Sequence, residues 1–360
     1  MTICYEKHLK GESSKFKKYE KIDEDFDLFI FTVGWESRCV EILDYFSQNS
    51  KIKNALVLSF SKENEKGYDQ QHYAEIEKFI QKNKLKSEPL EMMEDKYVEK
   101  KQSWLGEDKV PIRSKIIFDE NIKQIFNKIS TYLKDSGTVL KIGFDISSCP
   151  RRYLLSILAF CIKMNVSKKI TFFYSEGVYQ KDSFDENKYK FTLGRWVLTD
   201  LTMFKNRFEA DVKTNYLISV GFESNRYRGI ISDRSLKNVS FILPIPGYSE
   251  EYTHTMEEEL KTLKRERYIT KNGDNFATVE AGDAIEMWET LKLPQFNKKN
   301  FQMVYLPFGP KPHILGMGLH AILNNTVVLY RLSIGGYKRT DVKPNGNLWR
   351  YEITNLLLSE

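Results

Sequence analysis

The stretch FTVGWESRC (31–39) has a counterpart, ISVGFESNR (218–226), late in the same chain. In each copy a short apolar run ends at a glycine, and an aromatic residue, Glu-Ser and a nearby arginine follow. A glycine directly after an apolar run of strand length lets the backbone turn sharply into the next element. The repetition predicts two copies of one structural unit, each with this turn at the end of a buried strand.

The order of elements around the two copies is the same. In the first half, apolar runs predict strands at 27–33, 55–60, 139–147 and 169–175, and helical spacing predicts helices at 39–46, 71–83, 121–135 and 150–164. In the second half, after a short helix behind the glycine motif, we expect strands at 215–221, 240–247, 276–282, 301–309 and 326–333, and helices at 250–269, 284–291 and 313–322. Buried strands that alternate with helices are typical of a mostly parallel sheet covered on both faces.

Three pairs of matching residues separate the copies by a shrinking offset: Gly34 and Gly221 by 187 residues, Pro150 and Pro310 by 160, and Arg195 and Arg350 by 155. Extra loop residues in the first copy, among them an irregular insertion near 93–117, explain the trend. The fold class predicted is therefore α/β, with two tandem Rossmann-like parallel-sheet domains from an internal duplication. We expect the first domain to cover 1–207 and the second 208–360, with closing strands of similar sequence at 188–199 and 345–354.

The composition fits a folded protein with two cores. The chain has 360 residues, of which 41% are hydrophobic and 13% aromatic, and a disordered chain would be poorer in both. A net charge of +6 fits an anionic ligand or nucleic acid, and equally an ordinary lysine-rich protein. The four cysteines form neither a disulfide framework nor a metal site, so a reducing, cytoplasmic setting is expected. We expect no membrane segment and no cofactor, because no long apolar run, phosphate-binding loop, dinucleotide fingerprint or zinc motif occurs.

The glycine motif supplies the first candidate site, formed by Gly34, Glu36, Ser37 and Arg38 in the first copy and by Gly221, Glu223, Ser224 and Arg226 in the second. A structural interpretation is available, in which the serine caps the next helix and the glutamate lies near its positive end. The pairing favours a functional one, because a cap does not need a glycine, an aromatic residue and a glutamate together. The carboxylate would then hold a ribose hydroxyl or base edge, bind a metal, or act as a general base.

The second candidate site is FDISSCPRR (144–152), at the end of the strand that runs from 139. It contains an aspartate, two hydroxyls and two arginines beside a helix N-terminus, namely Asp145, Ser147, Ser148, Arg151 and Arg152. Hydroxyls, free backbone N–H groups and guanidinium groups together could hold a phosphate. In the alternative interpretation a serine caps the helix and the arginines are solvated or paired.

The third candidate site is PFGPKPH (307–313), at the corresponding strand end of the second copy. Gly309 would allow close backbone approach, and Lys311 takes the place of Arg151. His313 could donate to a phosphate or titrate near neutrality. The alternative is a proline-rich turn with a surface lysine.

These motifs resemble those of CARF domains, the CRISPR-associated Rossmann-fold sensors, and of the related SAVED domains, which look like two such units in one chain. The CARF pattern is a strand with a TVG turn, followed by a later strand ending in Asp-x-Ser/Thr-Gly-Gly-x-Lys. Asp145, Ser147 and Arg151 match its polar positions, while Ser148 and Cys149 replace the two glycines. Tyr305 stands where the second copy would carry the aspartate. The resemblance implies a sensor of bacterial antiviral defence that binds a nucleotide or cyclic oligonucleotide between its two repeats.

Two other functions remain open at this point. Glu36, Glu223 and Asp145 could instead catalyse the hydrolysis of a nucleotide or phosphodiester, and then loss of Glu36 would abolish rate more than binding. Direct DNA or RNA binding by an interaction subunit would depend steeply on salt. A pure sensor would need a separate effector protein, since no nuclease, protease or membrane domain is visible in the sequence. If the halves pair between chains, a homodimer would form the pocket.

Overall fold

The computed structural model describes residues 10–16, 20–60, 68–92, 109–178, 196–205, 209, 212–221, 223–297, 300–333 and 341–354. The chain divides into two compact units, each built on its own sheet. Unit 1 comprises Met1–Lys96, Arg113–Val178 and Arg339–Glu360, and unit 2 comprises Tyr97–Ile112 and Tyr179–Lys338. No helix in the described ranges is long and apolar enough to cross a membrane.

The sheet of unit 1 has a parallel centre and an antiparallel margin. Its strands lie in the order β1 (Lys10–Phe16), β13 (Lys343–Thr354), β6 (Ser167–Val178), β5 (Leu140–Asp145), β2 (Phe26–Val33), β3 (Ile52–Ser59) and β4 (Lys86–Glu91). Strands β2 to β6 run parallel to one another, whereas β13 is antiparallel to both β6 and β1. The central strands are buried along nearly their whole length, as expected for a sheet covered on both faces.

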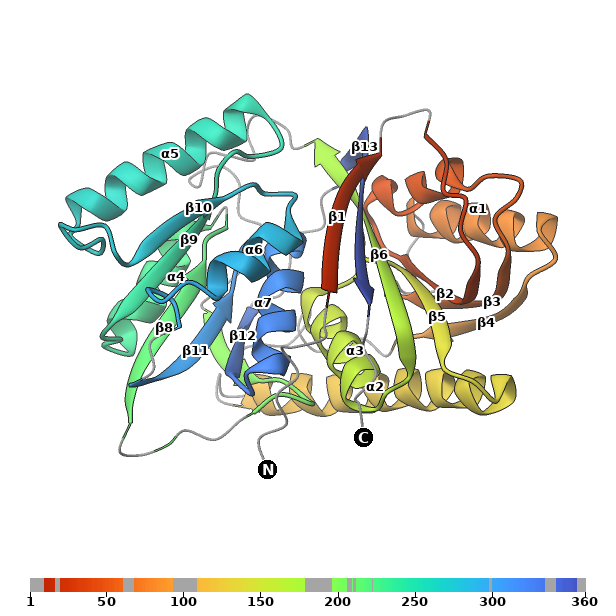
Figure 1. Ribbon diagram of the computed structural model, residues 1–360, viewed down its shortest axis with the longest axis horizontal. Coiled ribbons are helices and arrows are strands. Elements are labelled where there is room, and N and C mark those ends of the chain that lie inside the picture. The colour runs from red at the N-terminus through yellow and green to blue at the C-terminus, as the bar shows by residue number, and fades with distance from the viewer. Residues whose placement is uncertain are drawn as a thin grey trace. The chain divides into compact units, whose positions relative to one another are not determined.

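Helices cover both faces of this sheet (Figure 1). On one face, Phe29 and Phe31 of β2 pack with Ile76 and Ile80 of α1 (Tyr68–Lys82). On the other, α2 (Lys109–Ser136) and α3 (Arg151–Lys163) pack on each other through the rings of Phe126 and Phe160, stacked 4.1 Å apart. Two short 3-10 helices, η2 (Ser37–Cys39) and η3 (Glu41–Tyr45), connect β2 to β3.

Unit 2 has a sheet of the same kind. Its strands lie in the order β10 (Phe276–Val279), β9 (Val239–Pro244), β8 (Lys213–Ser219), β11 (Phe301–Pro307), β12 (Val327–Ser333) and β7 (Trp196–Asp200), and only β7 is antiparallel. Helices α4 (Ser224–Asp233) and α5 (Glu250–Arg265) share one core with β8, β9 and β11. Helices α6 (Ala284–Leu291) and α7 (Lys311–Leu323) pack closely at Gly316. A Cβ added there would lie 2.4 Å from the carbonyl oxygen of Ala284.

The parallel strands of the two units correspond one to one, which confirms the predicted α/β class with two Rossmann-like sheets. The order β6-β5-β2-β3-β4 of unit 1 corresponds to β12-β11-β8-β9-β10 of unit 2. Helices α3 and α7 both have 13 residues, follow a proline N-cap, and start at positions 160 apart. Asn165 and Asn325, also 160 apart, both adopt positive φ just after these helices.

The closing strands, however, are exchanged between the two units. Strand β7 follows β6 along the chain but pairs with β12 in unit 2, from Trp196 opposite Ser333 to Asp200 opposite Leu329. Strand β13 follows β12 along the chain but pairs with β6 in unit 1. The division into units therefore differs from the expected boundary at 207/208, because sheet pairing assigns each closing strand to the other half's sheet.

Several local expectations also differ from the structure. The helix expected at 39–46 is two 3-10 helices, and residues 109–117 of the expected insertion begin α2, which has Pro111 in its first turn, where proline is tolerated. Residues 93–108 lie outside the described ranges. Two strands had no sequence signal: β1 is polar and half exposed, and β4 contains Pro89, which an edge strand accepts.

Candidate functional site

The first two sequence motifs meet at the centre of the unit 1 sheet. From β2 the chain moves to β3 and β4 on one side, and from β5 it moves to β6 on the other, so the order of strands reverses between β2 and β5. Ligands of open α/β sheets bind outside the carboxyl ends of strands at such a point. Gly34, just after β2, lies there against Ser148, just after β5, and a Cβ on Gly34 would be 3.3 Å from the Cβ of Ser148.

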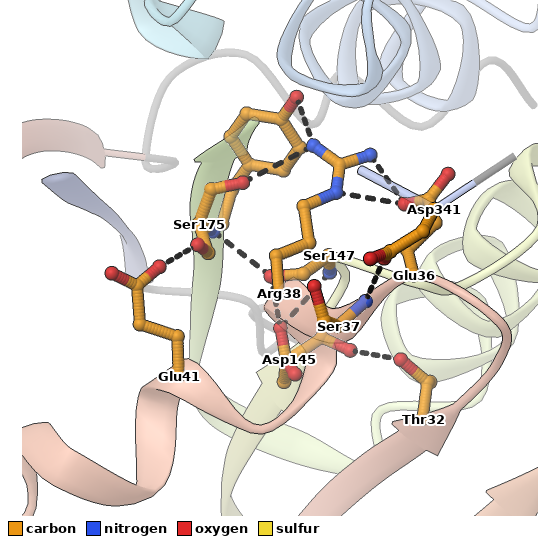
Figure 2. Close-up of polar contacts among 10 residues, drawn as sticks. Thr32, Glu36, Ser37, Arg38, Glu41, Asp145, Ser147, Ser175 and Asp341 are labelled. Atoms are coloured by element: carbon orange, nitrogen blue, oxygen red, sulfur yellow. Dashed lines mark hydrogen bonds and ion pairs between the residues drawn. The ribbon is translucent and has the colours of Figure 1, made fainter. Parts of the chain in front are cut away.

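Asp145 and Ser147 form a buried chain of hydrogen bonds that links β5 to β6 (Figure 2). The Asp145 Oδ1 atom accepts from the backbone N–H of Ser147 at 2.9 Å and from its hydroxyl at 2.6 Å. The Ser147 Oγ atom accepts in turn from the backbone N–H of Ser175 at 2.9 Å. Thr32 of β2 donates to the carbonyl of Asp145 at 3.0 Å. Both predicted polar residues therefore fix the ends of three neighbouring strands.

Glu36 and Arg38 form an ion pair within the glycine motif. The Glu36 Oε2 atom accepts from Nε of Arg38 at 2.7 Å and lies 2.6 Å from its Nη2. The guanidinium group is buried and also donates to the hydroxyl of Tyr174 and the carbonyl of Ser175, and it lies over the Tyr174 ring at 5.2 Å. A buried arginine needs such a counter-charge, so the primary partner of the Glu36 carboxylate is Arg38.

The same region receives contacts from the segment that begins β13. Asp341 Oδ1 accepts from the backbone N–H of Ser37 at 2.8 Å, and the carbonyl of Val342 accepts from the backbone N–H of Arg38 at 3.4 Å. Glu41 accepts a hydrogen bond from the Ser175 hydroxyl. Burial raises the pKa of Glu41, although hydrogen bonds from the Ser175 side chain and the Gly346 backbone partly offset this. Figure 2 shows Asp341, Ser175 and Glu41 near Arg38.

The serine of the motif is not a helix cap. Glu36 holds the N-cap position of η2, Glu223 that of α4, and neither helix start has a side-chain cap within the described residues. Cys39, beside Gly34 and Ser148, is no candidate nucleophile, because burial raises the pKa of its thiol to about 12.

Helix α3 begins beside this cluster. Its N-cap is Pro150, with no side-chain cap among the described residues, and its first turn carries Arg151 and Arg152. Arg152 is held by α2: it donates to the Ser114 hydroxyl at 3.2 Å and lies over the ring of Phe118 at 4.9 Å. Arg151 is partly exposed. The two arginines, predicted together, are therefore in different environments.

In unit 2 the glycine motif meets the third motif in a corresponding way. A Cβ on Gly221 would lie 2.4 Å from the carbonyl oxygen of Phe308, and one on Gly309 would lie 2.0 Å from Oγ of Ser219. Glu223 pairs with Arg331 of β12 at 3.4 Å, and Arg331 lies over the Trp196 ring at 4.0 Å. The side chains of Ser224 and Arg226 lie outside the described part of the structure.

Lys311 begins α7, as Arg151 begins α3. His313 is fully buried, its Nε2 atom 3.0 Å from the carbonyl of Glu280 and its Nδ1 atom 3.3 Å from the Ser219 hydroxyl. Because a carbonyl only accepts, Nε2 carries the proton and Nδ1 accepts from Ser219. Burial lowers the pKa of His313 to about 4, so the expectation that it titrates near neutrality is wrong, and it is a core residue.

Sequence reasoning missed several residues of these clusters: Glu41, Tyr174, Ser175, Trp196, Arg331 and Asp341. Two signals were present. Arg331 is a charged residue inside the apolar run VVLYRLS, which indicates a buried partner. Ser175 and Glu176 stand at the end of the apolar run ITFFY, at the carboxyl end of a parallel strand.

A separate groove of about 820 Å³ opens in unit 2 near the starts of β8, β11 and β12, and Lys213, Phe301 and Val327 line it. It contains none of the predicted site residues. In the described part of the chain, no group of three or more His, Cys, Asp or Glu side chains is placed to hold a metal ion.

No protein-family model and no curated protein matches the chain. Among solved structures, the chain is similar to the cytoplasmic domain of a prokaryotic cation chloride cotransporter, with 8% sequence identity and a TM-score of 0.26. The match covers 88% of this chain and 97% of the other. A TM-score this low carries no argument about fold or function.

Proposed function

We propose that unit 1 binds a phosphate-bearing nucleotide or cyclic oligonucleotide at the carboxyl ends of β2 and β5, and that it does so as a sensor. The observation that carries the proposal is the start of α3, which combines a proline N-cap and Arg151 at the point where the strand order reverses. The resemblance of the sequence motifs to CARF and SAVED domains supports the same function, in antiviral defence.

The start of α3 suits an anion. The first N–H groups of a helix lack intrahelical partners and carry a partial positive charge. Two other helices satisfy some of them with side chains: Ser249 caps α5, Asp283 caps α6, and both helices have acidic residues in the first turn, whereas α4 and α7, like α3, have no side-chain cap among the described residues. Helix α3 has basic residues there instead, and Arg151 can add a charge-assisted hydrogen bond to a phosphate.

Binding without turnover fits the carboxylates of the site. Glu36 already accepts from two nitrogen atoms of Arg38, and Asp145 accepts from the N–H and hydroxyl of Ser147. A general base needs a lone pair directed at the proton that it removes. These contacts favour a role for both carboxylates in holding the site in shape.

Incubation of the purified full-length protein with mononucleotides, cyclic dinucleotides and cyclic oligonucleotides tests the proposal. Native mass spectrometry measures retention, and chromatography of the supernatant measures turnover. We expect at least one compound to be retained and recovered intact. Consumption of the compound, abolished by Glu36→Gln, would instead identify an enzyme. Retention of none of them, together with salt-dependent binding of long DNA or RNA, would contradict the sensor and support an interaction subunit.

A further inference from the structure

We propose that each copy of the Gly-aromatic-Glu-Ser motif is a latch, which fastens the first residues of the strand that its unit receives from the other half of the chain. The strands concerned are β13 in unit 1 and β7 in unit 2. The two units provide two separate observations of this arrangement.

In unit 1 the motif holds the residues that lead into β13. Ser37 donates its N–H to the carboxylate of Asp341, and Arg38 donates its N–H to the carbonyl of Val342. The Arg38 side chain also reaches the carbonyl of Ser175 on β6, the strand on which β13 pairs. Glu36 keeps this guanidinium in place through two contacts of 2.7 and 2.6 Å.

Val342 and Arg38 both pack closely against Gly177 of β6. A Cβ on Gly177 of β6 would lie 2.2 Å from Cγ1 of Val342 and 3.2 Å from Nη1 of Arg38. Glycine at this position lets the arginine and the incoming strand approach the same part of β6. The pairing of β13 with β6 is irregular between Pro344 and Leu348, close to the start of β13. The hydrogen bonds between these two strands are therefore less regular at the first residues of β13 than along the rest of the strand.

In unit 2 the motif reaches the incoming strand by a different route. Glu223 pairs with Arg331, which comes from β12 rather than from the motif, and Arg331 lies over the ring of Trp196, the first residue of β7. Both arginines are buried, with 2% of Arg38 and 5% of Arg331 exposed, so each depends on its glutamate. In both units the glutamate of the motif holds a buried arginine against the incoming strand, although the two arginines come from unrelated positions. This indicates that holding the incoming strand is the shared function of the motif.

The latch gives the proposed sensor a way to signal, and this step rests on the proposed function. A ligand that draws Glu36 or Arg38 toward itself would loosen the entry of β13. Because β13 follows β12 along the chain, its entry is connected to unit 2 through the sequence itself. The latch itself needs no ligand, and its test uses none.

Hydrogen–deuterium exchange of the full-length protein tests the latch. In Glu36→Gln we expect peptides covering 341–347 to exchange at least tenfold faster than in the wild type. Glu352→Gln is the matched control, because Glu352 lies on β13 near its other end, pairs with Lys169 and Arg350, and has the same 18% exposed side chain as Glu36. The control should leave 341–347 unchanged.

The reciprocal variant, Glu223→Gln, should raise exchange at 196–200 and leave 341–347 unchanged. If Glu36→Gln does not fold, Asp341→Ala removes the contact to Ser37 and should still raise exchange at 341–347. The Ser37 and Arg38 N–H groups donate the latch bonds, so their exchange should rise as well. Unchanged exchange at 341–347 in Glu36→Gln, or an equal rise at 341–347 in the Glu352→Gln control, would overturn the latch. Failure of every compound in the binding panel would leave it standing, so the two proposals fail separately.

Discussion

Gly34 and Ser148 are in contact at the point where the strand order of unit 1 reverses, and a Cβ on Gly34 would lie 3.3 Å from the Cβ of Ser148. This contact joins two motifs that are far apart in the sequence. Gly221 and Phe308 make the corresponding contact in unit 2, where the added Cβ would lie 2.4 Å from a backbone oxygen. The space for a side chain is therefore smaller at Gly221 than at Gly34.

Alanine at these glycines should destabilise the protein unequally. Gly221→Ala should lower the free energy of unfolding by about 2–3 kcal/mol, because a backbone oxygen cannot move away, and Gly34→Ala by about 1 kcal/mol or less. Gly229→Ala is the control: Gly229 lies in α4, and an added Cβ would meet no atom within 4 Å beyond its own helix backbone, so alanine should stabilise by roughly 0.5–1 kcal/mol. Urea unfolding measures all three. An equal loss for Gly34 and Gly221 would contradict the geometry.

Asparagine and alanine at position 145 should separate the hydrogen-bonding role of the side chain from a requirement for its charge. Asp145→Asn keeps an oxygen that can accept from the N–H and hydroxyl of Ser147, so we expect a loss of at most about 1 kcal/mol. Asp145→Ala leaves both donors buried without that acceptor and should cost about 2–4 kcal/mol. Urea unfolding gives the difference. Asp145→Asn as damaging as Asp145→Ala would show that the charge itself is needed.

Acid should destabilise unit 2 through its buried histidines. Burial lowers the pKa of His313 and of His320 from the ordinary value of 6.5 to about 4, so the unfolded state binds more protons between these values. Their contribution to stability is complete above pH 6.5 and is lost as the pH falls toward 4. At pH 5 each should lower the free energy of unfolding by about 2 kcal/mol relative to pH 7.

Urea unfolding of the wild type and of His313→Gln at pH 5 and pH 7 measures this loss. The variant removes one titrating group, so its stability should change less between the two pH values. An identical pH dependence in both proteins would show that the pKa of His313 is the same in the folded and unfolded states, and would contradict a pKa lowered by burial.

The two arginines of α3 should behave differently. Arg152→Ala removes a hydrogen bond to Ser114 and the contact with the Phe118 ring, and should cost about 1–2 kcal/mol. Arg151→Ala should change the free energy of unfolding by less than about 0.5 kcal/mol. Thermal unfolding ranks the two variants. A larger loss for Arg151→Ala than for Arg152→Ala would assign Arg151 a structural role.

Local patterns in the sequence were enough to predict most of the fold. The apolar run 27–33 became β2, and the matching prolines at 150 and 310 both precede the helix that follows a central strand. These features depend on neighbours in the chain, so the sequence carries them directly. The repeated glycine motif also indicated two units of the same kind.

The strand exchange could not be predicted in this way. The similar closing strands show that each half ends alike, but the partner of a closing strand is decided by tertiary pairing. The pairing of Glu36 with Arg38 and the burial of His313 are likewise set by the folded environment. Sequence spacing suggested that Glu36 is open to a ligand and that His313 titrates near neutrality. In the folded protein Arg38 is the counter-ion of Glu36, and burial removes water from His313.

The affinity for an anionic ligand in an Arg151 variant tests the central claim most directly. With a compound retained in the binding panel, isothermal titration calorimetry would compare Arg151→Ala with Lys168→Ala, which removes the same charge from an exposed site at the start of β6. Loss of a charge-assisted hydrogen bond of about 1.5–3 kcal/mol predicts an affinity at least tenfold weaker for Arg151→Ala. Lys168→Ala should stay within about twofold of the wild type. Equal weakening in both variants, or none in either, would contradict a ligand site at the start of α3.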